Sequence, residues 1–382
     1  MKHRILSPLA IIALGAACTL SPAQAEIRIG VSLGVTGPGA SLGIPYKNGF
    51  QLAPKTLGGE PVTYLILDDE SKPDNAVRNA RRFVTEEKVD AIMGSNGVPS
   101  AVAMTQVAAD TGTPMIALTP IPPLDSARNK WTFVVPQTTE LMMSAVVEDM
   151  KKRNVKTIGF VGFSDTWGDL VYNAMQQLAP EAGMKVVTNE RYGRADTSVT
   201  GQVLKVMAAR PDAVVVGGSG SPAAPPHIGL RERGYKGPIY HNHGTVNLAF
   251  IQNGKKMVEG AIAPTGPLIV PEELPDDYAN RNVALDFTTR YEAAFGPESR
   301  NAFAGYSYDG VLLLDAAVAE ALKKAAPGTP EFRSALRDAL EQVKNVVGTH
   351  GVYNPGPDDH NGLDERARVL VQVKDGHWSL MK

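Results

Sequence analysis

The order of apolar runs along this chain restricts its fold more than any other feature. In the first third, the short runs "EIRIGVSL", "PVTYLILDDE", "VDAIMGS" and "PMIALTP" alternate with segments that predict helices over 46–57, 73–87 and 100–111. Runs that are apolar at nearly every position predict strands buried on both faces, which is typical of a parallel sheet covered by helices.

The same pattern starts again near Thr138. The predicted strands are "TIGFVGF", "KVVTNERY", "AVVVGGS", "PIYHNHG" and "GAIAPT", and helices over 168–182, 198–209 and 226–234 lie between them. Two doubly wound α/β units in tandem are therefore the simplest interpretation.

The last third does not predict a third unit. Helices over 283–295, 304–324 and 329–346 precede "VLVQVKDGHWSLMK", which reads as a short antiparallel pair, and the polar segment 354–362 predicts a surface loop. These pieces are too few for another sheet. We therefore expect them to complete the two units, with the chain crossing between the units more than twice.

The N-terminus predicts an exported, periplasmic protein. A basic start, an apolar run over 5–20 and the small residues before Glu26 indicate a signal peptide cleaved after Ala25. Cys18, the only cysteine, lies inside this signal, where a weak lipoprotein box leaves lipidation open as an alternative. No later apolar run reaches the roughly 20 residues of a membrane helix. The net charge of −2 argues against nucleic acid or an anionic membrane as partner.

Six predicted loops follow strands, at the edge where open α/β sheets bind ligands. They share Ser, Thr, Asn and Gly and are poor in the charged residues that catalysis or phosphate binding requires. Turn chemistry alone explains any one of them, but six together favour a binding site made of neutral donors. The loops are 36–42, 95–100, 119–123, 164–168, 217–221 and 242–245.

The glycine-rich stretch "GVTGPGASLG" (34–43) matches no cofactor motif. After Gly37 and Gly39, the next glycine comes one place too late for a dinucleotide fingerprint, and no Lys-Ser/Thr pair follows as in a phosphate loop. We therefore expect no cofactor. The stretch still leaves backbone N–H groups and the Ser41 hydroxyl at the start of a helix, where a small anionic group binds readily.

The next two loops predict an anion site on the first unit. "GSNGVPS" places Ser95, Asn96 and Ser100 at the start of a helix, where hydroxyls and free N–H groups favour a carboxylate. An N-cap role for Ser100 is the alternative. Thr119 lies beside Pro120 in a rigid loop, which loses little entropy when a ligand binds.

Aromatic and imidazole groups come from the second unit. Trp167, just before a helix, is either an apolar lid over a ligand or a core residue. His241 and His243 follow a strand, but nothing supplies the third ligand that a metal site needs, so we expect no metal and a hydrogen-bonding His243.

A catalytic nucleophile is not evident. "GGSGS" (217–221) has Ser221 where a nucleophile elbow requires glycine, and no cysteine lies outside the signal peptide. A secreted α/β hydrolase therefore stays an alternative without an identified reagent, and Ser219 is a candidate for ligand binding.

In series, these motifs resemble a known family. "RIGVSLGVTGPGASLG", "LDDESKPDNAV", "PMIALTP", "TIGFVGFSDTWGD" and "PDAVVVGG" resemble, in order and spacing, the periplasmic substrate-binding proteins of branched-chain amino acid type ABC transporters, the Leu/Ile/Val-binding proteins. The resemblance implies a type I periplasmic binding protein fold, with two Rossmann-like lobes and a three-crossing hinge. It also implies that the protein holds a solute between its lobes and delivers it to an inner-membrane permease. The absence of an identified catalytic group favours a non-enzymatic receptor, and nothing in the sequence requires more than a monomer.

The implied crossings fall near 138, 263 and 349. Lobe 1 would then comprise 26–137 and 264–348, and lobe 2 would comprise 138–263 and 349–382, after the signal peptide at 1–25.

The resemblance also narrows the solute. Amino acid binders of this family hold the α-carboxylate in loops that match 95–100 and 119–121, and cover it with an aromatic residue that matches Trp167. Their acidic partner for the α-ammonium matches His243 here, and an ammonium buried without an anion costs several kcal/mol. We therefore expect a small carboxylate without an amine, such as an aromatic or keto acid, held at its acidic end by neutral donors. A branched-chain amino acid is the alternative. The predicted ligand-binding residues are Ser41, Leu42, Ser95, Asn96, Ser100, Thr119, Pro120, Trp167, Ser219, His243 and Tyr306.

A sensory domain that reports its ligand to a membrane kinase is a third function class. It differs from a carrier only in its partner, and a cleaved signal without an anchor favours the carrier.

Overall fold

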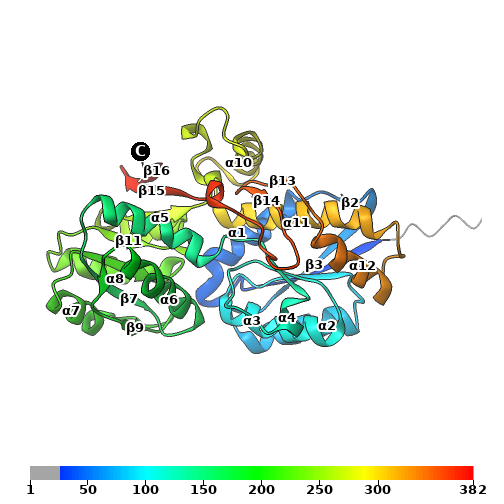
Figure 1. Ribbon diagram of the computed structural model, residues 1–382, viewed down its shortest axis with the longest axis horizontal. Helices are drawn as coiled ribbons and strands as arrows, with labels where there is room; N and C mark the ends of the chain where they lie inside the picture. The colour runs from blue at the N-terminus through cyan, green and yellow to red at the C-terminus, as the bar shows by residue number, and fades with distance from the viewer. Residues whose placement is uncertain (1–25, 382) are drawn as a thin grey trace, which may run out of the picture.

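The computed structural model describes residues 26–381, so the predicted signal peptide at 1–25 lies outside the described residues. Two α/β bodies stand side by side, each with a central sheet between helices (Figure 1). The structure thus confirms the predicted pair of doubly wound units. Within 26–381, no helix has the length and apolar character needed to cross a membrane.

The first sheet has the strand order β2-β3-β1-β4-β5-β6. Its strands are β1 (Ile27–Leu33), β2 (Thr56–Leu57), β3 (Glu60–Asp68), β4 (Ala91–Gly94), β5 (Met115–Ala117) and β6 (Thr132–Val134). The central strand β1 pairs in parallel with β3 and β4, with Ile29 opposite Tyr64 and Ala91. The strand order reverses beside β1, so the loops after β1 and β4 face one crevice, as they do in other doubly wound sheets.

The second sheet has the order β16-β15-β12-β11-β10-β7-β8, with β9 also beside β7. Its strands are β7 (Thr157–Phe163), β8 (Lys185–Val186), β9 (Glu190–Tyr192), β10 (Ala213–Gly217), β11 (Ile239–His241), β12 (Ile262–Thr265), β15 (Val369–Lys374) and β16 (His377–Leu380). The β15–β16 pair is antiparallel, as predicted. The single strand predicted for "KVVTNERY" is wrong, because β8 and β9 are separate strands that each pair with β7.

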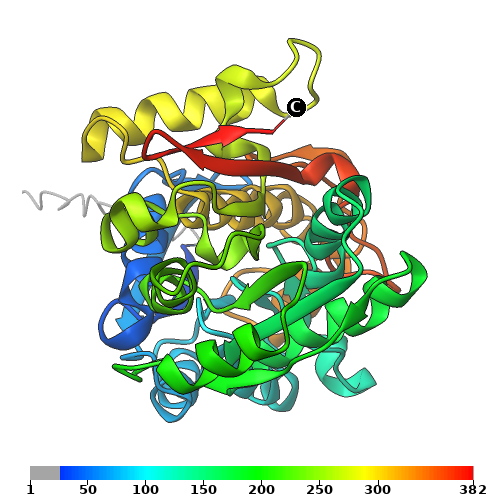
Figure 2. The same cartoon turned by 90° about the vertical axis from the view of Figure 1, so that its left-hand side faces the viewer.

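Helices cover both faces of each sheet (Figures 1 and 2). They are α1 (Ala40–Gln51), α2 (Pro73–Thr85), α3 (Val98–Thr111), α4 (Ser126–Asn129), α5 (Thr139–Lys152), α6 (Thr166–Glu181), α7 (Thr200–Ala208), α8 (Ala224–Glu232), α9 (Leu248–Gly254), α10 (Arg281–Phe295), α11 (Ala302–Ala321) and α12 (Pro330–Leu340). The late helix α11 packs against α1 and α12, while β15 and β16 join the second sheet, so the last third completes both bodies, as expected.

The helix predicted over 46–57 is wrong in its position, because α1 begins at Ala40 inside the glycine-rich stretch. A Cβ atom on Gly43 would lie 2.0 Å from the carbonyl oxygen of Gly34. Glycine at this position therefore lets the helix lie directly against the end of β1. The low helix propensity of glycine misled the prediction, whereas tertiary packing decides the structure here.

The surface loop predicted over 354–362 is also wrong at its end. His360 stacks on Phe133 of β6 with ring centroids 4.1 Å apart. Asn361 Nδ2 donates to the carbonyl oxygens of Val134 (2.9 Å) and Pro136 (2.8 Å). This segment therefore packs on the first body, and the predicted change of lobe near 349 stays a prediction.

Within residues 26–381, three connections join the two bodies: one after β6, one between β12 and α10, and one over 363–368. Two of them are hydrogen-bonded to each other, because Gln137 Nε2 donates to the carbonyl oxygen of Ala367 at 2.5 Å. The Tyr306 hydroxyl of α11 donates to Gln137 Oε1 at 2.6 Å, and the ring of His350 stacks on Tyr306 at 4.0 Å. The junction is thus a buried polar cluster.

Candidate ligand-binding site

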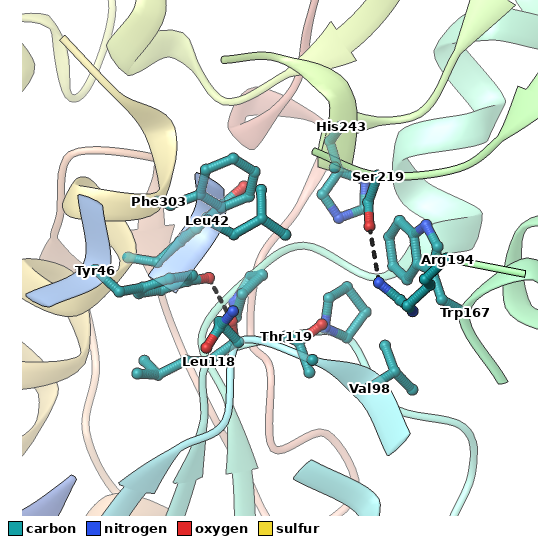
Figure 3. A pocket seen from close by; sticks show the side chains of 16 residues that line it. Leu42, Tyr46, Val98, Leu118, Thr119, Trp167, Arg194, Ser219, His243 and Phe303 are labelled. Atoms are coloured by element: carbon teal, nitrogen blue, oxygen red, sulfur yellow. Dashed lines mark hydrogen bonds between the residues drawn. The ribbon is translucent and has the colours of Figure 1, made fainter. Parts of the chain in front are cut away.

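A cavity lies between the two bodies (Figure 3). Each of the six predicted loops contributes at least one lining residue. The cavity is lined by Leu42, Tyr46, Asn96, Gly97, Val98, Leu118, Thr119, Pro120, Pro136, Trp167, Arg194, Ser219, His243, Gly244, Phe303 and Tyr306.

Eight of the predicted residues meet at this cavity, and three do not. Those that line it are Leu42, Asn96, Thr119, Pro120, Trp167, Ser219, His243 and Tyr306. The residues outside it are Ser41, Ser95 and Ser100.

Two of these serines have partners inside the protein. Ser95 Oγ donates to the buried carboxylate of Asp69 at 2.7 Å, and burial raises the pKa of Asp69. Ser41 Oγ accepts from the backbone N–H of Ser221 at 3.3 Å, which links the first body directly to the second. Both hydroxyls therefore make contacts within the protein, and direct ligand contact by Ser41 and Ser95 stays a prediction.

Ser100 lines an adjoining cavity, as does Ser95. This cavity shares Leu42, Asn96, Gly97 and Arg194 with the first. The N-cap alternative for Ser100 is wrong, because the helix starts earlier and Gly97 is the N-cap of α3. The serine stands in the first turn of the helix.

The side of the cavity formed by the first body, which we call the first wall, is mainly apolar. Leu42 and the rings of Tyr46, Phe303 and Tyr306 make most of it, with the ring centroids of Tyr46 and Phe303 5.7 Å apart. The Tyr46 hydroxyl donates to the carbonyl oxygen of Leu118. Burial raises the pKa of both tyrosines, so they stay neutral.

Asn96 also has its partners within the first body. Its Oδ1 accepts from the backbone N–H of Gly34 at 2.7 Å, and its Nδ2 donates to the carbonyl oxygen of Gly39 at 3.3 Å. The side chain holds the loop after β1 in place. It lines the cavity with one N–H of Nδ2 and one lone pair of Oδ1 still unused within the described residues.

The side formed by the second body, the second wall, contains Trp167, Arg194, Ser219 and His243 (Figure 3). Trp167 is 3% exposed, its Nε1 donates to the carbonyl oxygen of Gly218 at 3.3 Å, and its ring meets His243 edge-on at 5.4 Å. The ring of Trp167 therefore belongs to the core of the second body and also lines the cavity, and its role as a lid over a ligand stays a prediction.

Arg194 is the one cationic residue among those that line the cavity in the described chain. Its Nε donates to Asp165 Oδ2 at 2.5 Å and its Nη1 to Ser219 Oγ at 3.4 Å. The guanidinium carbon lies 4.3 Å from the ring centre of Phe163. The expectation of a site made only of neutral donors is therefore wrong.

Asp165 is held from the other side by the start of α6. Its Oδ1 accepts from the backbone N–H groups of Trp167 (2.9 Å) and Gly168 (3.3 Å), so it is the N-cap of that helix. One carboxylate therefore both caps a helix and orients Arg194.

His243 is a neutral ring with unused hydrogen-bonding capacity. It is 3% exposed, and burial lowers its pKa to about 3. Neither ring nitrogen has a hydrogen-bond partner among residues 26–381. A neutral imidazole has one donor and one acceptor nitrogen, and leaving either one buried and unpaired costs about 1–3 kcal/mol. A ligand in the cavity is the natural partner.

The neighbouring His241 belongs to a different environment. Its Nε2 lies 2.9 Å from Nδ1 of His227, and both rings are buried away from the cavity lining. In the part of the chain that the structure describes, no group of three His, Cys, Asp or Glu residues is placed to hold a metal.

Comparison with known proteins decides the family. The family model described as periplasmic binding protein matches residues 26–377, nearly all of the described chain. The chain belongs to the periplasmic binding protein family. It has the type I fold and is of the branched-chain amino acid type, which confirms both the resemblance and the predicted fold class.

Three known proteins show what this periplasmic binding protein is similar to. An extracellular ligand-binding receptor from Rhodopseudomonas palustris HaA2 is 44% identical, with a TM-score of 0.91 over 94% of this chain and 100% of that one. A Leu/Ile/Val-binding protein homologue from Brucella abortus is 23% identical over 98% of this chain and 95% of its own length. A solute-binding protein of an ABC transporter from Rhodopseudomonas palustris, in complex with benzoate, is 19% identical, with a TM-score of 0.79 over 93% and 95% of the two chains.

The cationic residue of this periplasmic binding protein escaped sequence analysis for a specific reason. Because "KVVTNERY" was interpreted as one strand, the loop that follows β9 was not placed at the ligand-binding edge. In the structure β9 runs parallel to β7, with Tyr192 opposite Phe163. Treating "NERY" as a strand of its own brings Arg194 to that edge by the same rule that identified the other six loops.

Proposed function

We propose that this periplasmic binding protein captures a small carboxylate without an amino group, such as an aromatic or keto acid, for an ABC importer. The charge of the cavity lining carries the proposal. Among the described residues that line the cavity there is one arginine and no Asp or Glu. An α-ammonium buried there lacks a counter-charge and faces Arg194, which costs several kcal/mol.

The other polar groups agree with this choice. His243, at the position that matches the acidic partner of amino acid binders, is neutral because burial lowers its pKa to about 3. The benzoate complex of the Rhodopseudomonas palustris relative supports an aromatic acid, whereas the Leu/Ile/Val-binding relatives support the alternative, a branched-chain amino acid. Arg194 favours the aromatic or keto acid over the amino acid.

The proposed lobes are the two bodies, each with its own sheet. The bounds are those expected from the sequence, except that 349–362 is assigned to lobe 1, because Thr349 and His350 donate to Asp309 of α11 and Asn361 donates to the carbonyls of Val134 and Pro136. A solute that touches both walls stabilises the closed arrangement, because a ligand favours the state in which it makes more contacts. The closed, loaded monomer then docks on an inner-membrane permease from the periplasm.

A secreted hydrolase is the competing class. Ser219 is its candidate nucleophile, but its Oγ is hydrogen-bonded to Arg194 and to no histidine within residues 26–381. A general base within hydrogen-bond reach is what activates a serine. We therefore propose a carrier without catalytic activity, and an assay on phenyl esters that shows turnover beyond one equivalent contradicts this.

A thermal-shift screen tests the ligand class. Benzoate, phenylacetate, phenylpyruvate, 4-methyl-2-oxopentanoate, leucine and valine are each added to the protein without its first 25 residues. A ligand present at 100 times its dissociation constant stabilises the folded state by about 2.7 kcal/mol. We expect at least one of the four acids to raise Tm and both amino acids to leave it unchanged. Stabilisation by leucine or valine alone contradicts the proposal and establishes the alternative.

A further inference from the structure

The two walls of the cavity differ in how many of their polar groups are already hydrogen-bonded. On the first wall, Asn96 is bonded to two backbone groups, and the hydroxyls of Tyr46 and Tyr306 donate to Leu118 and Gln137. Thr119 is the one side chain there whose hydroxyl has no hydrogen-bond partner within residues 26–381. The first wall therefore presents mostly carbon to a solute.

The second wall keeps its donors available. Both nitrogens of His243 lack partners within the described residues, and the ring is buried. Ser219 Oγ accepts from Arg194, so its own proton is free to be donated. Among the described residues, Nη2 of Arg194 makes no hydrogen bond, whereas Nε and Nη1 do.

Arg194 is also held in an orientation that suits a carboxylate. Asp165 binds its Nε, and the ring of Phe163 supports the flat face of the guanidinium. These contacts leave the edge formed by Nη1 and Nη2 for a ligand, next to Ser219. Two parallel N–H groups of this kind match the two oxygens of a carboxylate, and such bidentate pairs are among the strongest hydrogen-bonded contacts in proteins.

We propose that the carboxylate of the solute binds to the second wall, at Arg194, Ser219 and His243, and that its apolar body packs on the first wall, against Leu42, Tyr46 and Phe303. Asp165 is a positioning residue that holds Arg194. This inference rests on the proposed function. It reverses the polarity implied by the resemblance to amino acid binders, in which the acid lies against the loops that match 95–100 and 119–121.

The competing anchor for the acid is the N-terminus of α3, with the backbone N–H groups of Val98 and Ser100. Pro99, between them, has no N–H to donate. The side chain of Val98 packs into the core of the second body, and Ser95 is bonded to Asp69. This N-terminus therefore offers a carboxylate fewer hydrogen-bond donors than the second wall does. Mutations can distinguish the two anchors.

Isothermal titration with matched acids and amides tests the polarity. The probes are benzoate with benzamide and phenylacetate with phenylacetamide, because each pair differs only in the charged end. For the wild type we expect the acid to bind at least 10-fold more tightly than its amide. In Arg194→Gln the acid should lose at least 30-fold and the amide less than 3-fold, so that the preference disappears. In Thr119→Val the preference should persist.

Matched variants separate contact from bulk charge and from misfolding. Arg191 lies three residues earlier, pairs with Asp169 and does not line the cavity. Arg191→Gln therefore removes the same charge from the same body, and we expect the acid preference to stay within 3-fold of wild type. Arg194→Lys keeps the charge and should retain part of the preference, provided that its Tm shows a folded protein.

Asp165→Asn tests the positioning role. Asparagine caps a helix about as well as aspartate, so α6 should persist. Without the carboxylate, Arg194 loses its fixed orientation, and we expect the acid-to-amide ratio to fall at least 5-fold while amide binding changes little. A uniform loss for acid and amide contradicts the positioning role.

The outcomes distinguish this inference from the proposed function. If Arg194→Gln keeps the acid preference and Thr119→Val removes it, the acid lies on the first wall and the inference is wrong, although the carrier still binds acids. If leucine binds the wild type and no acid does, the proposed function fails and the inference fails with it. The same holds if no acid, amide or amino acid binds.

Discussion

The burial of His243 determines how its ring acts. Because its pKa is lowered to about 3, the ring stays neutral in the folded protein throughout the physiological range. Affinity for benzoate or phenylacetate should therefore vary less than about 2-fold between pH 6 and pH 8, measured by titration calorimetry. A rise in affinity as the pH falls through 6.5 would show instead that the ring gains a proton and attracts the anion.

Trp167 joins the cavity lining to the core of the second body, so its removal should affect both binding and stability. Trp167→Ala should lower the free energy of unfolding by about 3–5 kcal/mol, as is typical for large-to-small substitutions at buried aromatic residues. It should also weaken binding of the preferred acid at least 10-fold, measured at a temperature at which the variant is folded. Trp167→Phe keeps a ring and loses the hydrogen bond to Gly218, so it should show a smaller loss of both. Unchanged affinity in Trp167→Ala makes it a packing residue only.

At this scale, sequence reasoning found the loops of the cavity better than the roles of their side chains. Loop positions follow from strand order, which the apolar pattern reveals. Whether a hydroxyl points at a ligand or at a buried neighbour depends on tertiary contacts. Ser95 illustrates this, because its partner Asp69 lies 26 residues away in sequence. The missed Arg194 follows from one incorrect strand boundary.

Among the elements, α1 shows most directly what packing demands of sequence. Gly43→Ala places a methyl group against the carbonyl of Gly34 and should lower the free energy of unfolding by about 1–3 kcal/mol, the usual cost of overpacking. Gly201, in α7, has open space around the same position. Gly201→Ala should therefore stabilise the protein by about 0.5–1 kcal/mol through helix propensity. Urea denaturation of both variants checks the pair, and equal effects would contradict the packing argument.

The connections between the bodies offer a second test at the scale of elements. Gln137→Leu leaves the Tyr306 hydroxyl and the Ala367 carbonyl without their partner, and an unpaired buried polar group costs about 1–3 kcal/mol. Tyr306→Phe removes one side of the same contact. In the double variant, the loss of unfolding free energy should be smaller than the sum of the two single losses by about 1 kcal/mol or more. Strict additivity in guanidinium denaturation would mean that the two side chains do not interact.

Elements with long, regular patterns were predictable, and those fixed by contacts distant in sequence were not. The buried runs of β1, β7 and β10 and the helices α2 and α6 agree with their predicted ranges to within two or three residues. The start of α1 depends on glycine packing against a strand end, and the end of the 354–362 segment depends on its contacts with β6. Neither contact leaves a periodic signal in the chain.

For the whole molecule, buried histidines predict sensitivity to acid. Burial lowers the pKa of His227, His243 and His350 to about 3 and that of His241 well below its usual value. The unfolded chain therefore binds more protons than the folded one between about pH 3 and pH 6.5, and stability falls as the pH falls through this window. Asp309, whose pKa burial raises to about 6, acts in the opposite direction between about pH 4 and pH 6.

Burial also raises the pKa of Asp69 and Asp90, which act in the same direction as Asp309. The four histidines outweigh these aspartates in the balance, because each of the four pKa values is lowered to about 3 or well below its usual value. We expect the free energy of unfolding to fall by about 2–4 kcal/mol between pH 6.5 and pH 5.5, measured by urea denaturation at constant ionic strength. A constant free energy over this interval would show that the rings are protonated in the folded state.

The direct bond between Ser41 and Ser221 bears on the kinetics of loading. This hydrogen bond does not need a ligand. The same is true of Val98 of α3, which is 2% exposed and packs in the core of the second body. Such contacts favour the shut arrangement whether or not a guest is present. A solute can then bind only after the two bodies open spontaneously, so the observed association rate should level off at high solute concentration. Removing the Ser41–Ser221 hydrogen bond should raise both the association rate and the dissociation rate.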